Sequence, residues 1–153
     1  QDRVAQAVET AVKSGVKVVT GGKRADRPGY FFEPTLLLNA AKDNVAIRQE
    51  IFGPVISLIP SNDVDDAVRI ANESIYGLAG AVFSRDAEQV YKIGRRMRTG
   101  GVGQNGLKMD FTVPYGGFKQ SGIGREGGPE NFLPFLEKNH WPEALEWKAK
   151  LTP

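Results

Sequence analysis

The sequence predicts an α/β fold in which helices flank a mainly parallel sheet. Residues 2–14 and 63–74 place apolar side chains at helical spacing, and short runs rich in β-branched and aromatic residues alternate with these segments. Of the 153 residues, 41% are hydrophobic and 25% are charged, which is the composition of a globular chain with a buried core. In such folds, binding sites gather at the carboxyl ends of the strands.

The first elements are read from a helical stripe and two β runs. A helix is expected over residues 2–14, and Gly15 supplies a left-handed stop. A strand over residues 16–19 follows. Residues 30–38 (YFFEPTLLL) form the next β run, in which Pro34 cannot donate a ladder hydrogen bond and so predicts an edge strand or a bulge.

The middle of the chain continues the alternation. An apolar run at residues 57–59 precedes an amphipathic helix over residues 63–74, which has acidic residues in its first turn. Residues 78–83 read as a strand. Asp86 then opens another helix, with Gln89 three residues later in the manner of a capping box.

From residue 100 onward the alternation ends. Glycine-rich loops, a short helix after Pro129 and a mixed tail predict a segment that packs on something else. We therefore divide the chain into an α/β part, residues 1–110, and a glycine-rich crossing segment with an oligomerisation tail, residues 111–153.

Charge and residue usage exclude several classes of function. The net charge of +2 is small and the basic residues are scattered, so a nucleic-acid partner or a polybasic membrane patch is not expected. No apolar run approaches the roughly 20 residues that span a bilayer, so we expect a cytoplasmic protein that acts on a small molecule. Zero cysteines and one histidine argue against disulfides, a zinc site and a thiolate nucleophile within these residues. The start at Gln1, directly in a helical pattern, suggests a fragment.

Residues 43–54 form the most informative local stretch. Capping residues at one end and Gly-Pro at the other predict a short helix. Glu50 would then stand in the last turn, at the negative end of the helix dipole, at a cost of about 0.3 to 1 kcal/mol. A residue that breaks a local rule is a candidate for function, although Arg48 or Lys42 could neutralise Glu50 as an ordinary surface pair.

Four motifs in register carry a resemblance to a known family. They are residues 29–35 (GYFFEPT), 49–55 (QEIFGPV), 76–79 (YGLA) and 114–126 (PYGGFKQSGIGRE). In these motifs the chain resembles the C-terminal part of an NAD(P)-dependent aldehyde dehydrogenase, and the resemblance extends over residues 3–137.

The resemblance implies roles for five residues. Glu50 matches the glutamate that accepts hydrogen bonds from the hydroxyls of the nicotinamide-side ribose, and Phe52 matches the aromatic residue beside the nicotinamide, although core packing is the ordinary role of such a residue. Asn105 matches an asparagine that ends a strand near the active-site pocket, where a structural role is expected. Phe111 and Tyr115 fall where aromatics shape the aldehyde tunnel; the alternative for Phe111 is an ordinary position in a surface loop.

The function implied by the resemblance is oxidation of an aldehyde to a carboxylic acid with NAD or NADP through a cysteine thiohemiacetal. The cysteine and the general-base glutamate would lie upstream, so the isolated chain is expected to be inactive. A homo-oligomer, dimer or tetramer, is expected of the complete protein. The alternative is a non-catalytic assembly module derived from the same fold, in which Glu50 is incidental.

Two late segments need separate interpretation. Residues 122–127 (GIGREG) satisfy the dinucleotide-binding glycine pattern in letters, but they neither follow a buried strand nor open a long helix, so a structural crossing loop is expected. A generic anion-binding domain is disfavoured because no glycine loop precedes a helix N-terminus. Residues 135–141 depart from the family's late strand, and His140 is interpreted as a surface or interface residue.

Overall fold

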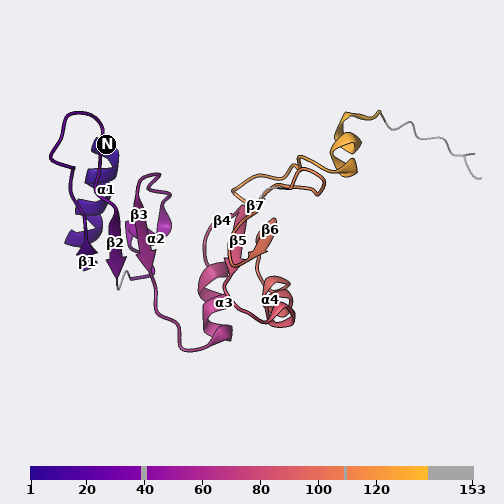
Figure 1. The fold of residues 1–153 in the computed structure, drawn as a ribbon, viewed down its shortest axis with the longest axis horizontal. Coiled ribbons are helices and arrows are strands. Elements are labelled where there is room, and N and C mark those ends of the chain that lie inside the picture. The colour runs from indigo at the N-terminus through magenta and orange to yellow at the C-terminus, as the bar shows by residue number, and fades with distance from the viewer. Residues whose placement is uncertain (39–40, 109, 138–153) are drawn as a thin grey trace, which may run out of the picture.

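The structure is a computed structural model that describes residues 1–38, 41–108 and 110–137. The described elements form two groups, which the segment after β3 joins (Figure 1). No helix within these ranges has the length and apolar character needed to cross a membrane.

The first group is a three-stranded sheet with two helices. It consists of α1 (Asp2–Lys13), β1 (Lys17–Thr20), β2 (Thr35–Leu38), α2 (Val45–Arg48) and β3 (Val55–Leu58). The strand order is β1-β2-β3, with β1 antiparallel and β3 parallel to β2. The predicted first helix and first strand are therefore confirmed.

The amphipathic stripe of α1 builds the core of this group. Val4, Val8 and Ala11 lie four and three residues apart, so they share one face of the helix, and at most 6% of each is exposed. They pack with Val16, Phe32 and Leu37 in one cluster. Leu37 is 0% exposed, which makes β2 the centre of this core.

Asn44 connects α2 to α1. Its Oδ1 accepts a hydrogen bond of 2.9 Å from the backbone N–H of Ala46, as an N-cap does, while its Nδ2 donates to the Ala11 carbonyl at 3.1 Å. The side chain is buried with both polar atoms satisfied, so this one residue sets the start of α2 and its position against α1.

The second group contains the remaining described helices and strands. They are α3 (Val64–Asn72), β4 (Tyr76–Gly77), β5 (Ala79–Val82), α4 (Ala87–Gly94), β6 (Gly101–Gln104), β7 (Phe118–Lys119) and the 3-10 helix η1 (Pro129–Phe135). Strands β5 and β6 are parallel, whereas β4 and β7 are antiparallel. Asp63 and Asp86 cap α3 and α4, and the helix expected after Pro129 is present as η1.

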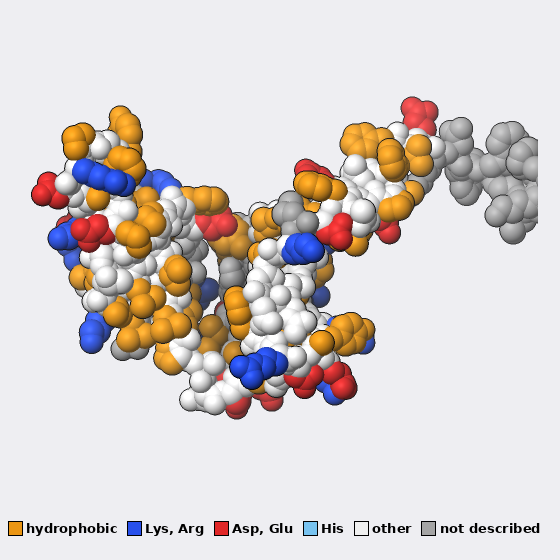
Figure 2. All heavy atoms as spheres, in the orientation of Figure 1, with side chains coloured by type: hydrophobic (Ala, Val, Ile, Leu, Met, Phe, Trp, Pro, Cys, Tyr) orange, Lys and Arg blue, Asp and Glu red, His pale blue; other side chains and the backbone are white. Residues whose placement is uncertain are grey.

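Close backbone approach holds the second group together. A Cβ on Gly100 would lie 1.5 Å from the Gly116 carbonyl oxygen, and one on Gly77 would lie 2.4 Å from that of Arg98. Among its described residues, only Val68 and Val90 are buried hydrophobic side chains. Exposed apolar side chains gather along the late segment and η1 (Figure 2).

The prediction of a mainly parallel sheet is wrong. The described strands form three small sheets with two parallel and two antiparallel pairings. Each parallel pair has a helix in its connection, α2 between β2 and β3 and α4 between β5 and β6. Strands β1 and β2 are joined by a loop without a helix, and a loop permits the antiparallel return.

The β run over residues 30–38 is shorter than predicted. Strand β2 begins only at Thr35, directly after Pro34, because proline has no N–H to donate. Upstream of Pro34, Phe32 makes only an isolated bridge with Arg24.

The predicted tail falls mostly outside the described residues. Phe135 ends η1 rather than opening a strand. His140 and the rest of the tail, residues 138–153, lie outside the described ranges. The division of the chain near residue 110 stays a prediction.

Candidate functional site

Glu50 lies on the segment between α2 and β3. Helix α2 ends at Arg48 because the next residue, Gln49, adopts an extended backbone with φ −121° and ψ 146°. The prediction that Glu50 stands in the last helical turn is therefore wrong, and the expected cost at the helix dipole does not arise.

The carboxylate of Glu50 is exposed. Among the described residues it accepts no hydrogen bond and forms no ion pair. Lys42 instead pairs with Glu73 at 3.0 Å, and the Arg48 guanidinium donates to the Glu73 carbonyl at 3.4 Å. The alternative in which Lys42 or Arg48 neutralises Glu50 is thus wrong, and both carboxylate oxygens of Glu50 are available to a ligand.

Phe52 does not occupy a core position. Its side chain is 78% exposed, and its φ of 48° lies in the left-handed region that residues other than glycine rarely adopt. Such backbone strain persists only where the surroundings impose it, and it concentrates at functional sites. The ring is thereby presented to solvent beside Glu50.

The amino end of α1 holds this segment in place. The Arg3 guanidinium donates to the carbonyl of Glu50 at 3.4 Å and to that of Phe52 at 3.3 Å. Behind the segment, a Cβ on Gly53 would lie 2.7 Å from Val4, so only a glycine allows the backbone to approach the helix this closely. The sequence interpretation missed Arg3; its signal is a cation in the first turn of a helix, where the dipole disfavours positive charge.

The residues present fit the cofactor that the resemblance implies. Vicinal ribose hydroxyls need a hydrogen-bond acceptor, which the unpaired Glu50 carboxylate provides. A flat heteroaromatic ring needs an apolar face, which the exposed Phe52 provides. Glu50 also lines a hollow of about 310 Å³ between α1 and α2.

Phe111 and Tyr115 lie at a different hollow. Its volume is about 290 Å³, and one of its walls consists of β6 and the residues directly after β6. Phe111 is 80% exposed, while Tyr115 is partly buried and pairs through its backbone with Glu126. The structure thus brings the two predicted pocket aromatics together, whereas Glu50 and Phe52 lie elsewhere on the chain.

Charged side chains also line this second hollow. They are Lys108, Asp110 and Glu126. The Thr112 hydroxyl donates to Asp110 at 2.6 Å and the Thr112 N–H at 2.9 Å, and these bonds hold the pKa of Asp110 below its ordinary value.

Asn105 follows the last residue of β6, and its side chain hydrogen-bonds to the backbone of the segment that follows β5. Its Oδ1 accepts from the Ser84 N–H at 2.9 Å, and its Nδ2 donates to the Ser84 carbonyl at 3.1 Å. Its φ of 55° is one that asparagine tolerates better than most residues. The amide thus joins the chain after β6 to the chain after β5.

The glycine motif at residues 122–127 is part of a crossing loop. Glu126 exchanges two backbone hydrogen bonds with Tyr115, at 2.6 and 2.7 Å, and the Arg125 guanidinium donates to the Gly117 carbonyl at 2.9 Å. The 3-10 helix η1 follows, so the strand–glycine–helix context of a dinucleotide site is absent from this part of the described chain, as predicted.

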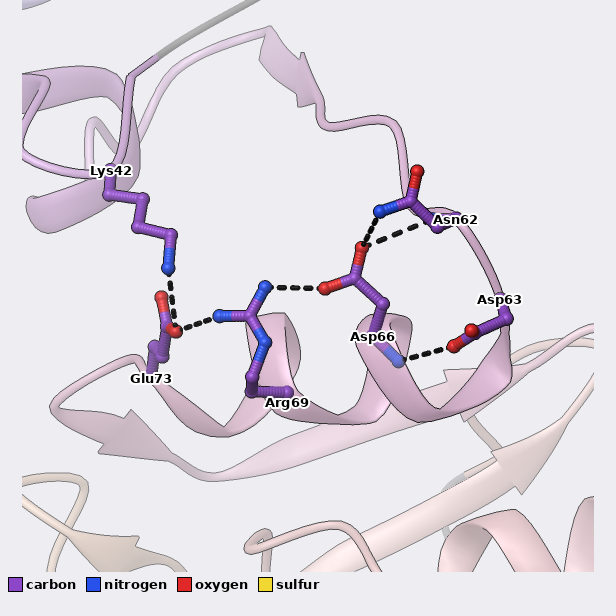
Figure 3. Close-up of polar contacts among 6 residues, drawn as sticks. All are labelled: Lys42, Asn62, Asp63, Asp66, Arg69 and Glu73. Carbon is purple, nitrogen blue, oxygen red and sulfur yellow. Dashed lines mark hydrogen bonds and ion pairs between the residues drawn. The ribbon is translucent and has the colours of Figure 1, made fainter.

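A chain of charges that the sequence interpretation did not anticipate links the two groups (Figure 3). Lys42 and Arg69 both bind the Glu73 carboxylate, and Arg69 also binds Asp66. The hydrogen bond from Lys42 lowers the pKa of Glu73, and the backbone hydrogen bond from Asn62 does the same for Asp66. The four charged residues Lys42, Asp66, Arg69 and Glu73 line a hollow of about 580 Å³ between α2, β3 and α3.

Comparison with known proteins places these features in a family. Residues 1–140 match the family model described as the aldehyde dehydrogenase family. The chain is 44% identical over 137 residues to the mitochondrial succinate-semialdehyde dehydrogenase of Rattus norvegicus, which covers 89% of this chain and 26% of that protein. It is 37% identical over 155 residues to the betaine aldehyde dehydrogenase of Bacillus subtilis, covering 95% of this chain and 32% of that protein.

The fold agrees with solved structures as well. A crystal structure of a Mycobacterium tuberculosis aldehyde dehydrogenase complexed with NAD⁺ superposes with a TM-score of 0.85 at 39% sequence identity. The match covers 89% of this chain and 29% of that one. The chain therefore spans between about a quarter and a third of the length of the proteins that it matches.

Proposed function

Because this chain belongs to the aldehyde dehydrogenase family, we propose that it is the C-terminal segment of an enzyme that oxidises an aldehyde to a carboxylic acid with NAD⁺ or NADP⁺. The observation that carries this proposal is the presentation of Glu50 and Phe52 on one short segment. The first offers an unpaired carboxylate and the second an exposed ring.

Each of the two residues has a defined task in the proposed enzyme. Glu50 accepts hydrogen bonds from the two hydroxyls of the nicotinamide-side ribose and so fixes the sugar. Phe52 lies beside the nicotinamide, limits its tilt and excludes water. When bound, NAD(P)⁺ supplies the hydride acceptor. Positioning matters because a displacement of about 1 Å can lower a rate on the order of 100-fold.

The remaining chemistry belongs to other parts of the proposed enzyme. These 153 residues contain no cysteine, so the thiolate that attacks the aldehyde and forms the thiohemiacetal comes from outside them, together with the general-base glutamate. This chain by itself is therefore expected to be inactive. Phe111 and Tyr115 contribute one wall of the aldehyde pocket, and Asn105 fixes the chain next to it.

The test is NAD(P)⁺ reduction by the protein that the complete reading frame encodes, with this chain alone as the control. Succinate semialdehyde and betaine aldehyde belong in the aldehyde panel because similar proteins are named for them. Each aldehyde is assayed with NAD⁺ and with NADP⁺, which also identifies the preferred cofactor. The proposal fails if the complete protein reduces neither cofactor with any aldehyde.

Substitution of Glu50 tests the assignment of the site. Glu50→Gln removes the charge and weakens the grip on the ribose, so a lower kcat and a higher cofactor KM are expected, with kcat/KM reduced about 10- to 100-fold. Glu88→Gln is the matched control. Glu88 is an exposed residue that lies far from Glu50 along the chain and pairs with Lys92 of its own helix. Equal kinetics for the two variants would contradict the role of Glu50.

A second candidate is a non-catalytic assembly module. The observation that favours it is the exposed apolar surface of the late segment, where Ile123 and Phe135 are 97% and 80% exposed. A complete protein that forms a stable oligomer but shows no turnover would support this alternative. In the proposed enzyme the same surface serves assembly of a homo-oligomer.

A further inference from the structure

The hollow of about 580 Å³ between α2, β3 and α3 lies apart from both proposed pockets. It shares no lining residue with the hollow at Glu50 or with the hollow at Tyr115. Small-molecule sites are typically concave and mostly apolar, with volumes of about 300 to 1,000 Å³, and they often form where two domains meet. This hollow fits that description, because it lies between the first and the second group of elements.

Three isoleucines give the hollow an apolar lining. Ile47 belongs to α2, Ile59 follows β3 and Ile70 belongs to α3, so each wall contributes one of them. All three side chains are partly buried. The polar neighbour Ser57 is already bonded, since its hydroxyl donates to the Ala46 carbonyl at 3.0 Å. An aliphatic group of a ligand would therefore meet apolar surface without separating a polar group from its partner.

Two cations at the hollow keep donors for a ligand. Among the described residues, the Lys42 ammonium donates to one carboxylate oxygen of Glu73 at 3.0 Å, and the Arg48 guanidinium donates to the Glu73 carbonyl at 3.4 Å. An ammonium carries three N–H donors and a guanidinium carries five, so each cation has donors left. Both residues are exposed, so a ligand can reach them from solvent.

The carboxylates at the hollow are already bonded. Arg69 binds both Asp66 and Glu73 (Figure 3). The backbone N–H and the side-chain amide of Asn62 also donate to Asp66, at 3.1 and 3.0 Å. A cationic ligand would have to displace these partners, whereas an anionic ligand meets donors that are in place. The charges at the hollow therefore favour an anion.

We propose that this hollow binds a small carboxylate with an aliphatic tail, with Lys42 and Arg48 bonded to the carboxylate and the three isoleucines packed around the tail. Charge-assisted hydrogen bonds hold the head group, and burial of apolar surface holds the tail. The choice of a carboxylate over other anions rests on the proposed function, because aldehyde oxidation produces a carboxylic acid. The enzyme thereby has a second place, apart from the segment that carries Glu50 and Phe52, at which its class of product binds.

The experiment is a calorimetric titration of the complete protein with hexanoate. The comparison probes are 1-hexanol, which has the tail without the charge, and inorganic phosphate, which has charge without a tail. Each should bind at least about tenfold more weakly than hexanoate. Lys42→Met and Lys92→Met form a matched pair, since each removes an exposed lysine that pairs with a glutamate, and Lys92 does not line the hollow. The Kd of hexanoate should rise about tenfold for Lys42→Met and stay unchanged for Lys92→Met.

A second pair tests the apolar part and covers the case in which Lys42→Met does not fold. Ala71→Leu adds volume inside the hollow, whereas Ala67→Leu adds the same volume on α3 outside its lining. Both alanines are exposed and leucine is a good helix former, so both variants should fold. Ala71→Leu should weaken hexanoate binding at least about tenfold by filling the space of the tail, and Ala67→Leu should leave it unchanged.

Three results would overturn the inference. Undetectable binding of hexanoate by the unmodified protein would show that the hollow does not take a carboxylate. Binding that neither Lys42→Met nor Ala71→Leu weakens would place the bound hexanoate elsewhere in the protein. Equal affinities for hexanoate and one of the two comparison probes would show that head and tail are not recognised together. Binding requires no turnover, so a protein that binds hexanoate in this hollow but reduces neither cofactor would support this site and contradict the proposed function.

Discussion

The two groups of elements are held together by different means. In the first group, six buried side chains from α1, β2 and their connecting segments form one cluster around Leu37. In the second group, buried apolar side chains are few and backbone meets backbone at glycines such as Gly100. The first group thus contains its own core, whereas the second relies on close backbone contact and leaves apolar surface exposed.

This difference bears on where each site residue is placed. Glu50 and Phe52 belong to the group with the closed core, so α1 and its arginine can fix their backbone without help from the second group. Phe111 and Tyr115 belong to the group whose apolar surface is open, so the shape of their hollow depends on what covers it.

The largest expected effect is that of Gly100→Ala. A Cβ there would lie 1.5 Å from the Gly116 carbonyl oxygen, and neither backbone can yield easily, so the free energy of unfolding should fall by about 4 kcal/mol. Gly101→Ala is the control, because a Cβ at Gly101 meets nothing within 4 Å. Urea denaturation measures both. Similar stabilities would mean that backbone approach does not hold the second group.

A somewhat smaller effect is expected from Leu37→Ala in the first group. Removal of a side chain that is 0% exposed leaves a cavity and should cost about 3 kcal/mol. Leu58→Ala, at a side chain that is 53% exposed, should cost less than about 1 kcal/mol. If the two losses measured by urea denaturation were equal, β2 would not be the centre of a closed core.

The smallest effect is expected from acid, at the Lys42–Glu73 pair between the groups and the Arg69–Asp66 pair within α3. Glu73 and Asp66 have pKa values below their ordinary 4.5 and 3.8, so both are more acidic folded than unfolded. Their contribution to stability is present above the ordinary pKa and is lost as the pH falls through the lowered folded values. The melting temperature should therefore fall below about pH 4.5, and Glu73→Gln should reduce this fall.

The control for the acid experiment is Glu9→Gln. Glu9 also has a lowered pKa because of its hydrogen bond from Lys13, but this pair lies within α1 and joins no groups. If the melting temperatures of Glu73→Gln and Glu9→Gln depend on pH in the same way, the Lys42–Glu73 pair does not couple the two groups.

Periodicity and capping predicted the elements because they act within one stretch of chain. The stripe of Val4, Ala7, Val8, Ala11 and Val12 predicted α1, although Val12 is 42% exposed, and Asp86 predicted the start of α4. The direction of strand pairing was predicted wrongly, since it depends on whether a helix forms in the connection. The loop between β1 and β2 has none.

The candidate site was predicted through motif resemblance, and its environment was not. The backbone carbonyls of Glu50 and Phe52 accept hydrogen bonds from Arg3 of α1, which lies 47 residues before Glu50 and 49 before Phe52. The pairing of Lys42 with Glu73 similarly crosses 31 residues. Local sequence rules carry no information about such partners, so both the helix end and the charge partners were assigned wrongly.

The attachment of the Glu50–Phe52 segment to Arg3 has a consequence for the order of folding. The two hydrogen bonds of Arg3 close stretches of 47 and 49 residues, whereas the turn of α1 into β1 closes within a few residues. Closure of a longer stretch costs more chain entropy and is slower. We therefore expect α1, β1 and β2 to assemble first. The segment that carries Glu50 and Phe52 would then take its native shape in the last step of the first group's folding.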